Sequence, residues 1–389
     1  MRRRSQGRLL AHLEVGLNVG ELTGRYGVVA VWEFHTTGDS PRGLQNVARG
    51  IMARGDRVFL TGGSGFVGSH ILRELLDAGY AVRALRRAPC HPERSAPSTS
   101  LRINCGAQSK DEGQLEWIEG NLRDVGGFAR TLDGCRYLIH CAALYSFAPR
   151  DRAALRAVNV AGTESLMLAA HLAGVERAVL TSSSATLGHA DSGYHRSKLD
   201  QERAAFASRL PVVALLPTAP IGPGDRKPTP TGRLVLDFAR GKIVAKAPGH
   251  GGMNLVAVED VARAHVAALE RGNAGERYVI GGENLSMDEI WRMLAQITGR
   301  PMPGWRAPYP LALAAAYFDE FRCAVTGATP AVPLEGVRLS RERMYADSSK
   351  AARELSYAPG SVRAALERAV AWYQDAGYTV APGRREATD

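Results

Sequence analysis

Residues Val58 to Gly68 read VFLTGGSGFVG, and this stretch decides the fold. An apolar start predicts a short β-strand, glycines follow at 62, 63, 65 and 68, and apolar residues then recur at helical spacing from Phe66 to Leu76. Glycines also mark ordinary tight turns, but here a strand and a helix supply the context that a phosphate-binding turn requires. Such a turn lets a pyrophosphate approach the backbone, where a helix N-terminus offers free N–H groups and partial positive charge. The predicted dinucleotide contacts in this stretch are Gly62, Gly65, Phe66, Val67 and Gly68.

The composition favours a globular protein that binds small molecules. The chain has 389 residues, 45% of them hydrophobic, which is enough for a full core and for two to three units. A net charge of +10 could suggest nucleic acid, but only six of the 49 basic residues are lysine, and basic residues are scattered among acidic ones. An excess of arginine over lysine is better explained by the base composition of the genome than by a nucleic-acid-binding surface. We therefore expect no nucleic-acid partner.

Membrane, secretory and metal-binding classes are not favoured. The sequence has no run of eighteen uncharged apolar residues and no apolar core of a secretory signal, so we expect no integral membrane segment. Five cysteines, odd in number and without CxxC spacing, predict reduced thiols and neither a disulfide framework nor a metal site. The expected location is cytoplasmic.

Composition divides the chain into unequal parts. Residues 1–51 lack periodicity and are expected to be a poorly ordered extension, with a targeting or docking arm as the alternative. We predict a dinucleotide-binding domain over 52–220, in which the Pro- and Ser-rich segment 88–113 is a long loop. Residues 221–375 are predicted to be mainly a substrate-binding lobe, with some segments returning to the first domain, and 376–389 a tail.

Strand-like and helical patterns alternate from Arg57 onward. The predicted strands are Val58–Leu60, Ala81–Leu85, Leu115–Ile118, Tyr137–His140, Ala178–Thr181 and Val212–Leu216. Amphipathic patterns that predict helices follow at Leu255–Leu269, Met287–Thr298 and Val362–Tyr373. Alternation of this kind predicts an α/β fold, a Rossmann-type doubly wound parallel sheet with a smaller C-terminal substrate-binding lobe.

A second group of residues carries acid–base chemistry. Tyr194 and Lys198 lie four residues apart, on one face of a helix, and a nearby ammonium should lower the pKa of the phenol. A phenol of that kind can donate or accept a proton near neutral pH. A serine cluster after the strand that ends at Thr181 could hold a substrate oxygen beside the phenol, and Asn159 could support Lys198 through its amide.

Together these motifs resemble the extended short-chain dehydrogenase/reductases, the NAD-dependent epimerase/dehydratase family, over residues 52 to about 375. The matching motifs are the glycine turn, His140–Ala143, Asn159–Thr163, the serine cluster, the Tyr194–Lys198 pair and Pro217. More narrowly, the chain resembles the hopanoid-associated sugar epimerases and the dihydroflavonol-reductase-like enzymes. That likeness rests on Pro228–Arg233, Asn254–Val256, Val258–Ala262 and Glu276–Asn284.

The resemblance implies a catalytic role for each of four residues. Tyr194 would be the acid/base, and Lys198 would tune it and bind the nicotinamide ribose. Ser183 would orient the substrate, with Ser184 as the alternative, although either serine could instead cap the end of its strand. Asn159 would support the lysine.

The cofactor can be argued from charge. Family members that prefer NAD carry an acid at the end of the second strand, 18 residues after the last motif glycine, where this chain has Arg86 followed by Arg87. Arginines cannot accept bonds from ribose hydroxyls but suit a 2′-phosphate, so NADP is favoured over NAD, unless both side chains simply face solvent. The resemblance further implies cofactor contacts from Asn121–Leu122, Ala142 and Pro217.

The reaction remains open between related outcomes. The resemblance implies hydride transfer with Tyr194 moving the proton, which epimerises a sugar or nucleotide sugar if the ketone stays bound and reduces a ketone if it leaves. Dehydration is disfavoured because Ser184-Ala185 replace the Asp-Glu pair of family dehydratases. The connection from Ser183 to Tyr194 is about half the usual length, which leaves open the substrate and also a non-catalytic cofactor-binding scaffold. A homodimer through two long helices is expected from the family.

Overall fold

A computed structural model describes residues 56–87, 113–146, 149–188, 193–243, 245–246, 248–326 and 334–379. All of them fall in one compact unit of the chain, Val47–Asp389. The predicted extension 1–51 and nearly all of the predicted loop 88–113 lie outside the described residues, as does 189–192 in the connection to Tyr194.

Seven parallel strands form the first sheet, in the order β3-β2-β1-β4-β5-β6-β9. Six of them match the six predicted strands to within one residue at each end. The predicted α/β class with a parallel doubly wound sheet is therefore confirmed. The strands are β1 (Arg57–Thr61), β2 (Ala81–Arg86), β3 (Leu115–Glu119), β4 (Tyr137–His140), β5 (Arg177–Thr181), β6 (Val212–Pro217) and β9 (Arg277–Ile280).

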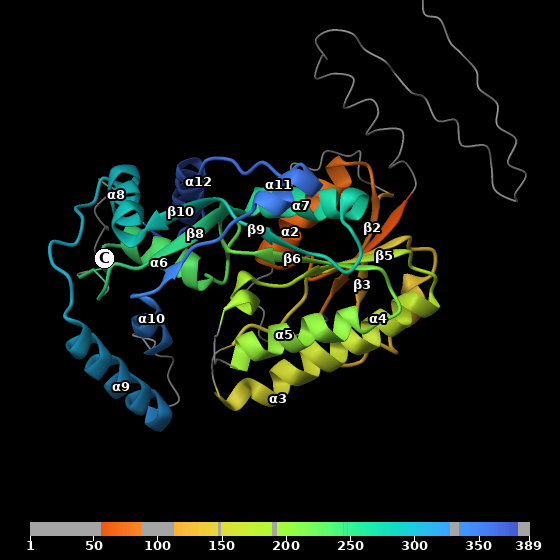
Figure 1. Cartoon of the computed structure of the whole chain (residues 1–389), viewed down its shortest axis with the longest axis horizontal. Helices are drawn as coiled ribbons and strands as arrows, with labels where there is room; N and C mark the ends of the chain where they lie inside the picture. Colours follow the sequence, from red (N-terminus) through yellow and green to blue (C-terminus); the bar gives the residue numbers. More distant parts are fainter. Residues whose placement is uncertain are drawn as a thin grey trace, which may run out of the picture. The chain divides into compact units, whose positions relative to one another are not determined.

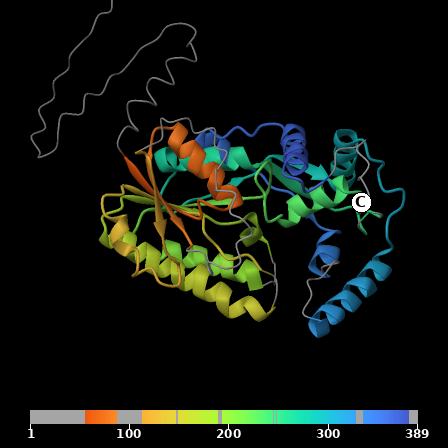
Figure 2. The same cartoon turned by 180° about the vertical axis from the view of Figure 1, so that it is seen from behind.

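Helices cover both faces of this sheet (Figure 1). On one face lie α2 (Phe66–Asp77), α7 (Val258–Arg271) and α11 (Ser349–Leu355). On the other lie α3 (Arg152–Leu155), the π-helical segment η3 (Arg156–Ala161), α4 (Gly162–Leu172) and α5 (Gly193–Phe206), as the view from behind also shows (Figure 2).

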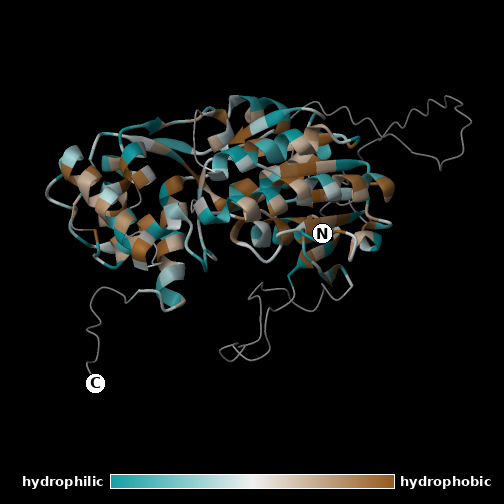
Figure 3. Ribbon diagram, turned by 90° about the horizontal axis from the view of Figure 1, so that it is seen from below, coloured by the Kyte–Doolittle hydropathy of each residue, from teal (hydrophilic) through white to brown (hydrophobic). Residues whose placement is uncertain are grey.

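Successive side chains along each strand point to opposite faces of the sheet and so contribute to two apolar cores. In β1, Val58 and Leu60 pack with α2 and α7, whereas Phe59 points to the opposite face and packs with α4. Because both faces are covered, the strands read as continuous apolar runs. The central strands are accordingly largely brown in Figure 3, while both colours alternate along the helices.

A smaller mixed sheet forms the second lobe. Its central strand β8 (Gly252–Ala257) pairs antiparallel with β10 (Glu283–Ser286) and parallel with β7 (Ala219–Ile221) and β11 (Arg343–Met344). An apolar core joins it to three helices, namely α6 (Pro230–Ala239), α8 (Met287–Thr298) and α12 (Val362–Asp375). Helices α9 (Tyr309–Thr326) and α10 (Leu334–Leu339) pack on each other through a separate cluster. Three short 3₁₀ turns complete the described elements: η1 (Ala129–Leu132), η2 (Pro149–Asp151) and η4 (Ser184–Leu187).

Two of the three predicted helices in the second half are confirmed, and one prediction is wrong in part. The helix at Met287–Thr298 has the predicted bounds, with a capping box from Ser286, and the last helix extends two residues beyond Tyr373. The predicted helix Leu255–Leu269 is instead the end of β8 followed by α7, which begins at Val258. Leu255–Ala257 are all buried, so this apolar run shows neither the spacing of a helix nor the alternation of a half-buried strand.

The chain also returns to the first sheet from the second lobe. Strand β9 pairs with β6, a pairing that the strand predictions did not include. Within the described ranges, no helix is long and apolar enough to cross a bilayer, and no group of three or more His, Cys, Asp or Glu residues is placed to hold a metal ion. The three described cysteines, Cys135, Cys141 and Cys323, are free thiols.

Candidate active site

The glycine turn folds back on the first turn of α2. Gly62 follows β1 with φ +78°, a conformation that side chains with a Cβ rarely adopt, and its carbonyl accepts from the N–H of Gly65 at 2.9 Å. A Cβ on Gly68 would collide with the Gly62 carbonyl group. The N-terminus of α2 has no side-chain cap and no acid in its first turn, so its N–H groups and positive end suit an anion.

The end of β4 lies directly against this turn. The hydroxyl of Thr61, the last residue of β1, accepts from the Ala142 N–H at 3.1 Å. A Cβ on Gly62 would lie 2.8 Å from the same nitrogen. Gly62, Gly65, Phe66, Val67, Gly68 and Ala142 are thus brought together at the carboxyl edge of the sheet, where open α/β folds bind ligands.

The residues predicted at the adenosine end lie on β2 and after β3. Arg86 ends β2, and its guanidinium pairs with Glu119 on β3 at 3.1 Å, with both side chains about half exposed. Arg87 is exposed beside it. Asn121 accepts from the Arg123 N–H at 3.0 Å, which shapes the turn after β3.

Two further predicted cofactor contacts are buried. Leu122 is buried below the turn after β3, where it packs close to Gly162. Pro217 is buried at the end of β6, where it pairs with Ile280 of β9.

Tyr194 and Lys198 both lie on α5, one turn apart. Lys198 is only 2% exposed, and its Nζ donates to the Thr181 carbonyl at 2.7 Å and to Gln201 Oε1 at 2.5 Å. Burial disfavours the charged form and lowers the pKa of Lys198 to about 8.

The expectation that Lys198 lowers the pKa of Tyr194 is wrong for this arrangement. Burial is the main cause of a raised pKa of the Tyr194 phenol, and the nearby Cys141 thiol adds to it. The ammonium does not counter this, because its bonds run to Thr181 and Gln201. The Tyr194 phenol is therefore neutral at neutral pH.

Asn159 holds the segment after β4 against α5. Its Oδ1 accepts from the Leu144 N–H at 2.7 Å, and its Nδ2 donates to the Leu144 carbonyl at 3.0 Å and to Ser197 Oγ at 3.1 Å. It lies in the π-helical segment η3, a distortion often found at functional sites. Its amide thus bonds to the residue before Lys198 and not directly to the ammonium.

The serine cluster divides among different tasks. Ser183 is half-buried after β5, and its Oγ accepts from the Ala185 N–H at 3.2 Å, which caps η4. Ser184 is the first residue of that turn. Ser182 points inward and donates to the buried Glu202. The cap on Ser183 leaves its hydroxyl proton available to a substrate oxygen.

Tyr145 is a site residue that the sequence predictions missed. Its ring centroid lies 4.6 Å from that of Tyr194 in an edge-on contact, and it is 47% exposed. The His195 ring lies 5.9 Å from Tyr194 on another side. These rings border the phenol, and the position of Tyr145 two residues after the His140–Ala143 motif was the available signal.

Gln201 and Glu202 were also missed. Both are buried on α5, three and four residues after Lys198, so helical spacing placed them beside it. Thr181 was singled out only as a strand end, although its carbonyl accepts from Lys198 and its hydroxyl donates to His265 at 2.7 Å.

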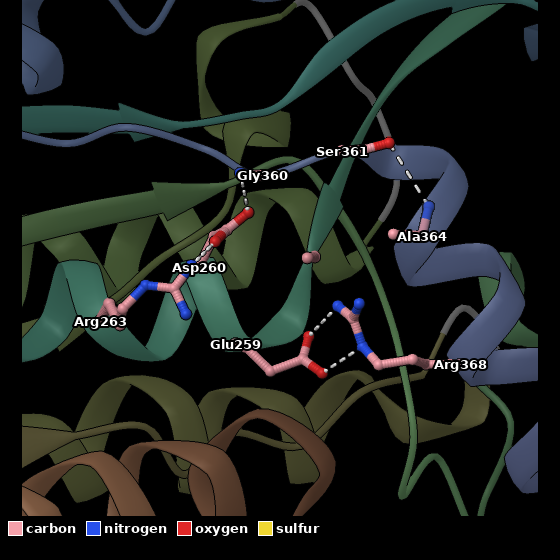
Figure 4. A pocket seen from close by; sticks show the side chains of 8 residues that line it. Glu259, Asp260, Arg263, Gly360, Ser361, Ala364 and Arg368 are labelled. Atoms are coloured by element: carbon pink, nitrogen blue, oxygen red, sulfur yellow. Dashed lines mark hydrogen bonds and ion pairs between the residues drawn. The ribbon is translucent and has the colours of Figure 1, made fainter.

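A surface pocket lies away from these residues (Figure 4). Its volume is about 390 Å³, and it lies between the starts of α7 and α12. Its charged groups pair with each other: Arg368 with Glu259 at 3.0 Å, and Arg263 with Asp260, which also accepts from the Gly360 N–H. The predicted site residues, all of which the structure describes, do not line it, so it is not the candidate active site.

The sequence of this chain is similar to those of known proteins. A sequence model of the "NAD dependent epimerase/dehydratase family" matches residues 58–281. A Synechocystis sp. protein provisionally named dihydroflavonol 4-reductase is 38% identical over 351 residues, covering 84% of this chain and 97% of the relative.

Solved structures show the same fold. One described as gox2253 has a TM-score of 0.67 at 34% identity and covers 83% of this chain and 99% of its own. Another, MoeE5 in complex with UDP-glucose and NAD, has a TM-score of 0.62 at 27% identity, with 83% and 99% covered.

Proposed function

This chain belongs to the NAD dependent epimerase/dehydratase family and is an NAD(P)-dependent epimerase/reductase, and from that premise we propose that it reduces a ketone with NADPH. The observation that carries the proposal is that Tyr194 and the buried Lys198 lie one turn apart on α5, after a strand of the sheet that also carries the glycine turn. Ketone reduction needs a proton donor at the carbonyl oxygen, and a tyrosine phenol, which is protonated at neutral pH, supplies one.

The cradle fits a dinucleotide. Gly62 and Gly68 leave space that a Cβ would fill, and the uncapped N-terminus of α2 offers N–H groups to a pyrophosphate. A bound NADPH supplies the hydride. Tyr194 gives its proton to the oxygen of the substrate, so that one ketone, one NADPH and one proton become one alcohol and one NADP⁺.

The other site residues position the reacting groups. Two of the three ammonium protons of Lys198 go to Thr181 and Gln201, which leaves the third for a ribose hydroxyl of the cofactor. Ser183 orients the substrate oxygen, and Asn159 fixes the segment that carries Tyr145.

Arg86 and Arg87 support NADPH as the cofactor. Both side chains are exposed at the end of β2, where a 2′-phosphate would meet them. Arg86 is already paired with Glu119, so the phosphate would share or displace that carboxylate. The ion pair of Arg86 with Glu119 is exposed to solvent, so it contributes little free energy and a phosphate can readily replace the carboxylate.

A sugar epimerase of the hopanoid-associated type is the second candidate. It is favoured by the motif resemblance and by the likeness to MoeE5, which was solved with UDP-glucose and NAD. The first candidate stands ahead of it because the 38% identical relative has the name of a reductase. The two differ in whether the ketone leaves the site.

Absorbance near 340 nm tests both candidates. We expect purified protein to consume added NADPH in the presence of cyclic ketones. Tightly retained cofactor with no net consumption, together with epimerised nucleotide sugar, would support the second candidate, and absence of any cofactor binding would reject both.

Replacing Tyr194 with Phe tests the proton donor. We expect a loss of kcat of at least about a hundredfold, since general acid catalysis contributes about 10²–10⁴-fold. The matched control is Tyr317→Phe, which removes a phenol on α9 that accepts from Arg338 of α10. Unchanged turnover in Tyr194→Phe would reject Tyr194 as the proton donor.

A homodimer through α4 and α5 completes the proposal. Leu168 and Leu172 of α4 are 59% and 77% exposed, as an interface in the free chain would leave them. Light scattering after size exclusion tests this, and a monomeric mass at micromolar concentration would reject it.

A further inference from the structure

Buried polar side chains form a connected network beneath Lys198. Gln201, one turn further along α5, is fully buried, and its Oε1 accepts from Nζ at 2.5 Å. The ammonium also donates to the Thr181 carbonyl. Among the described residues, Gln201 is thus the side chain that bonds directly to the ammonium.

The orientation of the Gln201 amide is fixed from its other end. Its Nε2 donates to Thr163 Oγ1 at 3.1 Å. Thr163 uses its own proton to donate to the Asn159 carbonyl at 2.7 Å, so its oxygen is free to accept from Gln201. A flipped amide would set its NH₂ group against the Lys198 ammonium, so Oε1 faces Lys198.

His140 closes the network. Its Nε2 lies 2.8 Å from Thr163 Oγ1 and 3.2 Å from Gln201 Nε2. Its Nδ1 lies 2.7 Å from Thr61 Oγ1, and Thr61 in turn accepts from the Ala142 N–H. The network joins Lys198 to the last residue before the glycine turn.

Burial keeps the His140 side chain of this network uncharged. The fully buried His140 has its pKa lowered to about 3, by burial first and by the charge of Lys198 second. It therefore stays uncharged at neutral pH and does not repel the ammonium.

The nearest carboxylate is directed elsewhere. Glu202 accepts from Ser182 and from Thr186, and its other oxygen lies 2.9 Å from Arg277 Nε. Its charge still acts on Lys198 through space, as does the Cys141 thiol. The direct partner of the ammonium is nevertheless a carboxamide.

Other ionisable groups near α5 lie at its outer side. Tyr194 on α5 itself has a neutral phenol, and His265 of α7 bonds to Thr181 in its neutral form. The elements packed against α5 carry four more ionisable side chains. Arg152, Arg156 and Glu164 are exposed, and His171 is half-buried. These four do not contribute to the pKa shift of Lys198.

We propose that Gln201 is a positioning residue of the active site, which holds the Lys198 ammonium in place as a neutral acceptor and leaves its proton exchangeable. The proposal rests on the proposed function for its catalytic consequence. A carboxylate at this position would hold the proton more tightly, and an apolar side chain would release the ammonium from its site.

Titration of the lysines tests the positioning without any turnover. The chain has six lysines, so protein labelled with ¹³C at lysine Cε gives few signals, and Lys198→Met identifies that of Lys198. We expect Gln201→Glu to raise the titration midpoint of Lys198 by about one pH unit or more, and Gln201→Met to lower it. The matched control is Arg203→Gln, which makes the same change in net charge at the exposed face of α5.

The same variants test the catalytic consequence. The pH profile of kcat should shift upward at its alkaline limb in Gln201→Glu and follow the midpoint of Lys198. Equal Lys198 midpoints in Gln201→Glu and Arg203→Gln would overturn the positioning role, whatever the activity. Shifted midpoints in a protein that reduces no ketone would support it and reject the proposed function instead.

Discussion

Replacing Lys198 with Met should change how the stability of the protein depends on pH. The pKa of Lys198 falls from 10.5 in the unfolded chain to about 8 in the buried site. Between these values the unfolded chain holds a proton that the folded chain has lost, so folding stability rises with pH over that interval. The shift corresponds to about 3 kcal/mol, gained as the pH rises from about 8 to about 10.5.

The pH dependence isolates the charge from the bonds that the substitution also removes. Methionine leaves the Thr181 carbonyl and Gln201 Oε1 without their donor, at a cost of about 1–3 kcal/mol for each buried acceptor. That cost does not vary with pH, so it moves the whole curve of the variant without changing its shape.

Urea unfolding monitored by tryptophan fluorescence provides the assay. The free energy of unfolding of the wild-type protein minus that of Lys198→Met should be flat below about pH 8 and then rise by about 3 kcal/mol toward pH 10.5. A difference that stays constant to within about 0.5 kcal/mol across this range would refute the reasoning, because Lys198 would then have an ordinary pKa.

Two further predictions concern the cofactor site. Gly68→Ala should lower NADPH affinity by at least about tenfold and destabilise the fold by about 1–3 kcal/mol, because the added Cβ collides with the Gly62 carbonyl. Binding and melting measurements check the two effects. Gly304→Ala is the control for both, because its added Cβ meets open space. Arg86→Gln should reduce the ratio of NADPH to NADH affinity by about tenfold or more, as one charge-assisted phosphate contact is lost. Fluorescence titration measures that ratio, with Glu119→Gln expected to raise it, and an unchanged ratio in Arg86→Gln would count against NADP specificity.

Local patterns were enough to predict most of the fold. The first sheet could be predicted because its strands are short apolar runs separated by helices, and a strand covered on both faces has that signature. The pattern failed at Leu255–Ala257, where a buried strand runs straight into α7 and no turn residue marks the boundary. Strand β9 was missed because its pairing with β6 depends on a return from the second lobe.

For the candidate site, the sequence predicted which residues share a helix but not which atoms they bond to. Helical spacing correctly places Tyr194 and Lys198 one turn apart on α5. It does not tell where the ammonium points, which is to Thr181 and Gln201, and burial of the phenol raises its pKa where a lowered one was expected. Asn159 was expected at the lysine but bonds to Leu144 and Ser197.

The sequence by itself determined the strand, turn and helix of Val58–Leu76 and the residue types of the active site, because these depend on neighbours a few positions apart. Only the tertiary structure decided the charge states. The pKa values of Tyr194 and Lys198 follow from burial, and the neutral network beneath Lys198 joins Gln201 to His140, 61 positions earlier in the chain. Desolvation and bonds of that range exist only once the sheet and its helices have been packed together.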